Sequence, residues 1–267
     1  MSRTIALGLA GIAVSAAMLG FGFYSGKHDA VAAQVVEAPA DGAVHDRAGI
    51  EGIVREYLIE NPELMLEVQA ALETKQQERQ RVVQEGTIAT DRDLIFASDR
   101  DGVTGNPAGK VTLVEFFDYN CGYCKRSFPD VEALTAENPD IRMVYKEFPI
   151  LGPDSQKAHV VSMAFRALMP EKWPEFHRTL MKGARANEEV AMRVALSLGA
   201  DESALRKEMQ NPEIAGAFET TYELANKLSI TGTPSYVVGK EVVFGALGKD
   251  VLSEKVAAAR GCGAETC

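Results

Sequence analysis

Apolar and polar positions form two kinds of pattern along this chain. Short apolar runs bounded by turn residues are typical of strands, and they predict strands near 94–97, 111–117, 141–147, 235–238 and 241–244. Apolar residues at helical spacing predict a helix from the cysteine motif to about Glu137, another over about 249–260, and a mostly helical segment at about 150–228. Intermixed strands and helices indicate an α/β domain.

Two further helices are predicted in residues 47–87. The first has an apolar stripe at helical spacing, made of Ile50, Ile53, Val54, Tyr57 and Leu58. Asn61 is expected to cap a second helix with Pro62 at its first position, and the stripe of that helix is Leu64, Val68, Ala71 and Leu72. Such short helices do not bury their stripes against each other alone, so they either pack on the rest of the chain or meet other copies of themselves.

The most informative motif is Cys121-Gly122-Tyr123-Cys124, between an apolar strand and a helical pattern. A cysteine at a helix start meets unpaired N–H groups and the positive end of the helix dipole, and both favour a thiolate. The second cysteine, one turn later, can form a disulfide with it. The alternative is half of a four-cysteine zinc site, which needs a second close pair. Cys262 and Cys267 are spaced too widely for that, so we expect redox chemistry without a metal or cofactor.

A proline loop, Thr231-Gly232-Thr233-Pro234, precedes the last two predicted strands. The cysteine motif in its βα context is a thioredoxin-like signal, and a thioredoxin fold needs such a loop opposite its cysteines. A cis proline there would leave the neighbouring backbone free to pair with a substrate peptide. The alternative is an ordinary loop proline before an edge strand. Gly239 and Lys240 predict a two-residue hairpin turn between the strands.

These motifs resemble the DsbA-like branch of the thioredoxin superfamily, and specifically its secreted ScsC (suppressor of copper sensitivity protein C) group. The similar segments are 115–124, 144–149 and 232–234, which anchor a match over about 88–260. The resemblance implies a thioredoxin fold with a helical insertion, in which Gly122, Tyr123, Thr233 and Pro234 contact the substrate. The Gly-Tyr dipeptide and the threonine before the proline are similar to the disulfide isomerase DsbC, whereas the oxidase DsbA has Pro-His and valine.

Glu115 and Lys146 interrupt two apolar strands. A buried carboxylate costs several kcal/mol unless it is paired or protonated, so we expect a Glu115–Lys146 pair beneath the cysteines. In DsbA-like proteins the matching acid and lysine help to move the proton of the buried second cysteine, and the resemblance implies that role here. The alternative places both side chains in solvent.

Residues 1–32 have the composition of an export signal. Arg3 precedes an uncharged, Ala/Gly-rich stretch, and Ala30-Val31-Ala32 is a possible cleavage site. Because the apolar stretch is about as long as a membrane span, an uncleaved anchor facing the periplasm is the alternative. A linker is expected at 33–46. Both interpretations place the catalytic domain in the periplasm, where cysteines meet an oxidising environment.

The remaining residues change this picture little. A hydrophobic content of 46% in 267 residues is enough for a core, and a net charge of −10 argues against nucleic acid as a partner.

In the tail at 261–267, Cys262 and Cys267 are expected to form a small structural disulfide, with a second redox pair or a copper(I) site as alternatives. In the helical insertion, Trp173, Phe176 and Met181 are expected in the core rather than in a peptide groove. His159 and His177 are expected in the core or at the surface rather than as ligands.

The expected function is a thiol–disulfide oxidoreductase that acts mainly as an isomerase or reductase on exported cysteine-containing proteins. Cys121 would attack a substrate disulfide and Cys124 would resolve the mixed disulfide. Such an enzyme needs a membrane reductase of the DsbD or ScsB kind. One alternative is a DsbA-like oxidase with a DsbB-like quinone partner, and another is a copper-sequestering protein with the cysteines as soft ligands. By resemblance, residues 47–87 are an oligomerisation stalk that forms trimers.

Overall fold

The computed structural model describes residues 47–261 of the chain, which divides into two units at Leu66 and Glu67. The predicted leader, the linker and the tail cysteines Cys262 and Cys267 lie outside the described residues. The helices are α2 (Arg47–Glu60), α3 (Glu63–Thr90), α4 (Arg92–Phe96), α5 (Gly122–Glu137), α6 (Pro153–Leu168), α7 (Trp173–Lys182), α8 (Glu188–Ser197), α9 (Glu202–Glu208), α10 (Pro212–Lys227) and α11 (Lys249–Gly261). The strands are β1 (Gly102–Gly105), β2 (Val111–Phe117), β3 (Ile141–Glu147), β4 (Ser235–Val238) and β5 (Glu241–Phe244), and a 3₁₀ turn spans Pro170–Lys172.

The first unit contains α2 and the first residues of α3. Helix α2 has no buried residue, and its large apolar side chains are exposed except for the half-buried Leu58. The side chain of Asn61 does not cap the start of α3 as predicted. Its amide nitrogen instead donates to the carbonyl of Tyr57 at 2.9 Å, and this carbonyl also accepts the backbone N–H of Asn61 at the end of α2.

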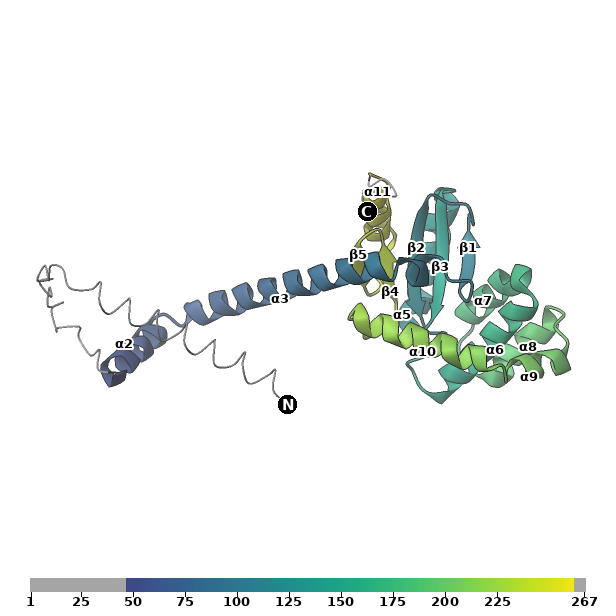
Figure 1. Cartoon of the computed structure of the whole chain (residues 1–267), viewed down its shortest axis with the longest axis horizontal. Coiled ribbons are helices and arrows are strands. Elements are labelled where there is room, and N and C mark those ends of the chain that lie inside the picture. The colour runs from purple at the N-terminus through teal and green to yellow at the C-terminus, as the bar shows by residue number, and fades with distance from the viewer. Residues whose placement is uncertain (1–46, 262–267) are drawn as a thin grey trace, which may run out of the picture. The chain divides into compact units, whose positions relative to one another are not determined.

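The second unit is built on a five-stranded sheet with the order β1-β3-β2-β4-β5. Strands β2 and β3 pair in parallel, and the other neighbours pair antiparallel. A two-residue turn at Gly239 and Lys240 joins β4 to β5, as predicted, and Gly239 has the positive φ of 59° that such a turn requires. Helices α6 to α10 form the insertion between β3 and β4 (Figure 1).

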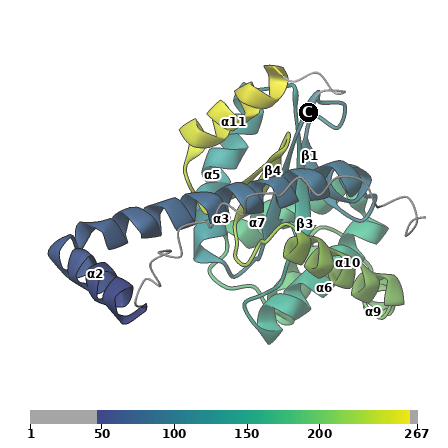
Figure 2. The ribbon, with the colours of Figure 1, turned by 60° about the vertical axis from the view of Figure 1, so that its left-hand side comes forward.

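Side chains from alternate positions of β2 enter two separate cores, one on each face of the sheet. Leu113 and Phe117 pack with α5, α6, α7 and α11, whereas Val114 and Phe116 pack with the end of α3, with α4 and with α10. Figure 2 shows α5 and α11 together on one side of the second unit and α10 on another. The architecture is the expected thioredoxin fold with a helical insertion.

Two sequence expectations about the start of this unit were wrong. Residues 94–97 were expected as a strand, but they belong to α4 and the residue after it, because a short apolar run is equally compatible with a buried helical turn. The first strand is instead β1, whose sequence Gly-Val-Thr-Gly has no apolar run. Gly102 is required there by close packing, since an added Cβ would lie 2.0 Å from the ring of Trp173.

The end of α3 belongs to the second unit. Ile88 is buried in the core shared with α4 and α10, and the Gln84 side chain donates to the carbonyl of Leu228 at 2.7 Å. The boundary that the sequence placed between residues 87 and 88 therefore falls inside a continuous helix.

Candidate active site

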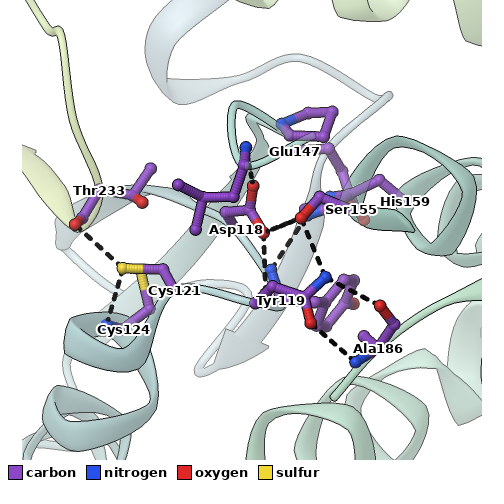
Figure 3. Close-up of polar contacts among 12 residues, drawn as sticks. Asp118, Tyr119, Cys121, Cys124, Glu147, Ser155, His159, Ala186 and Thr233 are labelled. Atoms are coloured by element: carbon purple, nitrogen blue, oxygen red, sulfur yellow. Dashed lines mark hydrogen bonds and ion pairs between the residues drawn. The ribbon is translucent and has the colours of Figure 1, made fainter. Parts of the chain in front are cut away.

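Cys121 occupies the position just before α5, where the backbone N–H groups of the first turn are free. Its sulfur accepts a hydrogen bond from the backbone N–H of Cys124 at 3.3 Å (Figure 3). A hydrogen bond from the Cys124 thiol is the main reason that the pKa of Cys121 is lowered to about 6. Burial opposes this effect, and hydrogen bonds from the Thr233 side chain and from the backbone N–H groups of Tyr123 and Cys124 add to it. A thiol with this pKa is largely ionised near neutral pH and is therefore a nucleophile.

Cys124 has the opposite character. Its side chain is fully buried in the first turn of α5, and both cysteines are free thiols. Burial raises the pKa of the Cys124 thiol far above its ordinary range, and the hydrogen bond to Cys121 and the charge of Glu115 act in the same direction. The pair is therefore divided into a largely ionised sulfur on a residue that keeps a small exposed fraction and a protonated sulfur on a fully buried one.

The proline loop lies against Cys121, as expected. The Thr233–Pro234 peptide bond is cis, and the Cys121 sulfur lies 3.1 Å from the carbonyl oxygen of Thr233, to which it donates when it is protonated (Figure 3). Gly122 and Tyr123 are exposed at the start of α5, and the Tyr123 ring stacks beneath the guanidinium of Arg126 at 4.3 Å. The structure thus brings together Cys121, Cys124 and Thr233, with Gly122 and Tyr123 beside them.

The predicted Glu115–Lys146 pair does not form. In the parallel register, Glu115 lies opposite Tyr145 and Lys146 lies opposite Phe116, so the two side chains point to opposite faces of the sheet. Lys146 forms an ion pair with Asp101 at 2.6 Å and also donates to the carbonyl of Leu94. Neither side chain reaches solvent, so the alternative of two exposed charges is wrong as well.

Glu115 remains on the same face as the cysteines. Its side chain is buried, and neither carboxyl oxygen has a hydrogen-bond partner among the described residues. Burial is the main reason that the pKa of Glu115 is raised to about 8, and the charge of Cys121 adds to it. A carboxyl group with this pKa can take up or release a proton near neutral pH.

Comparison with known proteins decides the family. A model of the DSBA-like thioredoxin domain matches residues 112–257, more than half of the chain. The chain belongs to the DSBA-like thioredoxin family. A second model, the N-terminal domain of the copper resistance protein ScsC, matches residues 46–79.

Several solved structures and curated relatives are also similar to this chain. A thioredoxin-like oxidoreductase from Silicibacter pomeroyi is 40% identical with a TM-score of 0.60, covering 64% of this chain and 98% of that one. A linker-deletion mutant of ScsC from Proteus mirabilis is 25% identical with a TM-score of 0.63, covering 82% and 99%. The Na⁺/H⁺ antiporter NhaA 3 of Salinispora tropica is 27% identical over 164 residues, and the match spans 60% of this chain but only 25% of that relative. The DSBA-like domain of this chain is thus a thiol:disulfide oxidoreductase domain.

The sequence analysis missed how this DSBA-like domain holds its cysteine loop. Asp118 accepts hydrogen bonds from the backbone N–H of Leu151 at 3.0 Å and from the Ser155 hydroxyl at 2.7 Å (Figure 3). The Asn120 side chain pairs with both backbone groups of Ala186, each at 2.8 Å. Asp118 and Asn120, three positions and one position before Cys121, therefore attach the loop to the helical insertion at separate points.

A buried polar network lies behind this loop. His159 accepts a hydrogen bond from the backbone N–H of Tyr119 at Nε2, and its Nδ1 contacts Glu147. The Ser162 hydroxyl donates to Glu147 at 2.6 Å. Burial disfavours a charged ring, but Glu147 and Asp118 together raise the pKa of His159. These contacts join the end of β3 to α6.

The core positions expected in the insertion are confirmed by burial. Trp173, Phe176, Met181, His159 and His177 are all buried in the core. Within residues 47–261, no group of three or more His, Cys, Asp or Glu side chains is arranged to hold a metal ion.

Proposed function

We propose that the protein is a periplasmic thiol:disulfide oxidoreductase that acts mainly as an isomerase or reductase on exported proteins. The observation that supports this proposal best is the division of roles between the cysteines. Cys121 has a lowered pKa and lies beside the Thr233 carbonyl, whereas Cys124 is buried and protonated. The cysteine that is ready to attack a substrate disulfide is thus also the less deeply buried of the two.

The exchange has two steps. The Cys121 thiolate attacks one sulfur of a substrate disulfide, and the other substrate sulfur leaves as a thiolate. Cys124 then loses its proton and attacks Cys121, which releases the reduced substrate, or a substrate thiol attacks instead and a new pairing results. Thr233 and Pro234 hold the substrate peptide through main-chain contacts, and Gly122 and Tyr123 flank it.

Two features support isomerase work. The Gly-Tyr dipeptide and the threonine before Pro234 are isomerase-like by resemblance. Nine large apolar side chains of α2 and of the first half of α3 are also exposed, and they are Ile50, Ile53, Val54, Tyr57, Ile59, Met65, Leu66, Val68 and Leu72. Soluble proteins seldom leave so many exposed together without a partner.

We propose that these side chains meet other copies of the chain and form a trimer, as the resemblance implies. Several active sites on one particle raise the effective concentration of thiolate around a misfolded substrate, which helps a second exchange to follow the first. An isomerase must be kept reduced, so its partner would be a membrane reductase of the DsbD or ScsB kind. Within residues 47–261, no helix combines the length and apolar content needed to cross a membrane.

The second candidate is a disulfide oxidase kept oxidised by a DsbB-like partner. The low pKa of Cys121 favours it, because a stabilised thiolate makes the reduced form more stable and the disulfide a stronger oxidant. Thiol trapping of Cys121 and Cys124 in intact cells separates the two, since an isomerase is found reduced and an oxidase is found oxidised.

A variant pair tests the catalytic assignment itself. Cys124→Ala should accumulate mixed disulfides with exported proteins, while Cys121→Ala should trap none. Equal trapping by both variants would contradict the assignment.

A truncation tests the isomerase proposal. The mature protein should scatter light as an oligomer, and removal of residues 33–72, which spares the buried Gln84 and Ile88, should leave a monomer. That monomer should still reduce disulfides but lose most isomerase activity on a scrambled substrate with several disulfides. A monomeric mature protein at micromolar concentration would remove this argument for an isomerase.

A further inference from the structure

Glu115 is buried without the cation that the sequence predicted for it. Its cross-strand neighbours are two tyrosines, Tyr145 on β3 and Tyr236 on β4, so both rings lie on the face of the sheet that carries the cysteines. Both tyrosines are buried. Because an ionised carboxylate needs a hydrogen-bond donor in such surroundings, the two hydroxyl groups are the natural sources of one.

The two hydroxyl groups make different contacts. Tyr236 donates to the Ser127 hydroxyl at 3.0 Å, and Ser127 in turn donates to the carbonyl of Cys124 at 3.1 Å. The Tyr236 hydroxyl thus connects the strand after Pro234 to the first turn of α5. The Tyr145 hydroxyl interacts instead with Thr104 on β1, away from the cysteines.

We propose that Tyr236 is a positioning residue for Glu115, and that its hydroxyl turns from Ser127 to the Glu115 carboxylate when that group loses its proton. A hydroxyl has one proton to donate and rotates freely to do so. While Glu115 is protonated, the Tyr236 hydroxyl donates to Ser127, as in the structure. Once Glu115 is ionised, donation to the carboxylate is stronger, because a hydrogen bond to a charged acceptor exceeds one to a neutral acceptor. Tyr236 lowers the pKa of Glu115 and so opposes the rise that burial causes, as a donor to the ionised carboxylate does.

The proposal deepens the resolution step of the proposed function and rests on it. In that step the Cys124 thiol gives its proton to the Glu115 carboxylate. The Cys124 thiolate forms a bond to the Cys121 sulfur, the bond from Cys121 to the substrate sulfur breaks, and the substrate leaves as a thiolate. By stabilising ionised Glu115, Tyr236 keeps a larger fraction of it ready to accept the proton at neutral pH.

Tyr236→Phe and Tyr145→Phe make a matched pair, since each removes the hydroxyl of a cross-strand neighbour of Glu115 and leaves the ring. Resolution is followed in single turnover, by release of a fluorescent thiol from a mixed disulfide formed on Cys121. Tyr236→Phe should move the midpoint of the pH profile upward by about one unit and slow resolution at pH 7 by roughly threefold or more. Tyr145→Phe should leave the profile unchanged.

A double variant separates this role from a structural one. If Tyr236 acts through Glu115, adding Tyr236→Phe to Glu115→Gln should cause no further slowing. An equal slowing in both backgrounds, or an unshifted midpoint in the single variant, would overturn the proposal.

A second measurement does not depend on turnover. The ¹³C carboxyl resonance of Glu115, assigned by its loss in Glu115→Gln, should titrate at higher pH in Tyr236→Phe than in the parent protein and in Tyr145→Phe. An unshifted titration would refute the inference even if thiol exchange fails, whereas failure of Cys121 to form any mixed disulfide would refute the proposed function alone.

Discussion

Glu115 on β2 and Lys146 on β3 are buried charged residues that interrupt apolar strands, and the surroundings of the two differ. Lys146 faces the core shared by α3, α4 and α10, where Asp101 pairs with it. Glu115 faces the core under the cysteines and has no hydrogen-bond partner among the described residues. A buried charge that is fully paired serves the fold, whereas one left without a partner has a displaced pKa and can exchange protons.

The same division appears in the two pKa values. Burial raises the pKa of Asp101 to about 6, but Lys146 opposes that rise. Burial raises the pKa of Glu115 to about 8, with no cation to oppose it. The comparison predicts that loss of Lys146 harms stability, and that loss of the Glu115 charge improves stability and harms the chemistry.

The largest expected effect is that of Lys146→Met. The change leaves Asp101 buried without its partner, and we expect a loss of about 3–5 kcal/mol in the free energy of unfolding. The loss should be greater at pH 8 than at pH 5, because Asp101 can be protonated at the lower pH. Urea denaturation at both pH values measures it. The double variant Asp101→Asn/Lys146→Met is the control, and it should recover part of the loss.

Glu115→Gln should raise the free energy of unfolding, in contrast to Lys146→Met. The pKa of Glu115 is about 8 in the folded protein against an ordinary 4.5, so folding takes up a proton between these values and stability falls as the pH rises through this window. At pH 7 the loss corresponds to 2.5 pH units, on the order of 3 kcal/mol. The glutamine variant should avoid it and be more stable than the parent at pH 7, with the gain vanishing near pH 4.5. A gain that does not vary with pH would show that Glu115 has an ordinary pKa.

The elements around this comparison could mostly be predicted from the sequence. Strands β2 to β5 and helix α5 have clear periodic patterns, and the cysteine motif and Thr233–Pro234 are local signals. The Glu115–Lys146 pairing could not be predicted, because both strands were known but the register between them was not. A shift of one residue moves a side chain to the other face of the sheet.

The hydrogen bonds that hold the active-site loop could not be predicted from the sequence for a related reason. Asp118 and Asn120 are ordinary polar loop residues in the sequence, and their partners lie up to 66 residues away in the helical insertion. The Tyr236 hydroxyl is likewise 109 residues from Ser127. No local pattern reports contacts of this kind, since only the packing of the insertion against the sheet creates them.

A smaller effect should follow from Cys124→Ala. A hydrogen bond from the Cys124 thiol is the main cause of the low pKa of Cys121, and the variant removes it while the contacts with Thr233 and with backbone N–H groups remain. The alkylation rate of Cys121 should have its midpoint near pH 6 in the parent protein and about one unit higher in the variant. Iodoacetamide labelling between pH 4 and pH 9, read by mass spectrometry, measures both. Cys124→Ser, which keeps a donor at this position, should show a smaller shift.

The smallest expected effect is the electrostatic coupling between Cys121 and Glu115. The charge on Cys121 helps to raise the pKa of Glu115, so a neutral group on the Cys121 sulfur should lower that pKa. Carbamidomethylation of Cys121 in Cys124→Ala removes the thiolate and leaves Glu115 in place. The stability gained by Glu115→Gln at pH 7 should then be smaller in the alkylated protein than in the unmodified one, by about 1 kcal/mol or less. Urea denaturation of the four species, with and without each change, gives the coupling between Cys121 and Glu115 directly. If the gain is the same before and after alkylation, burial alone sets the pKa of Glu115, and the unpaired carboxylate does not sense the redox-active sulfur above it.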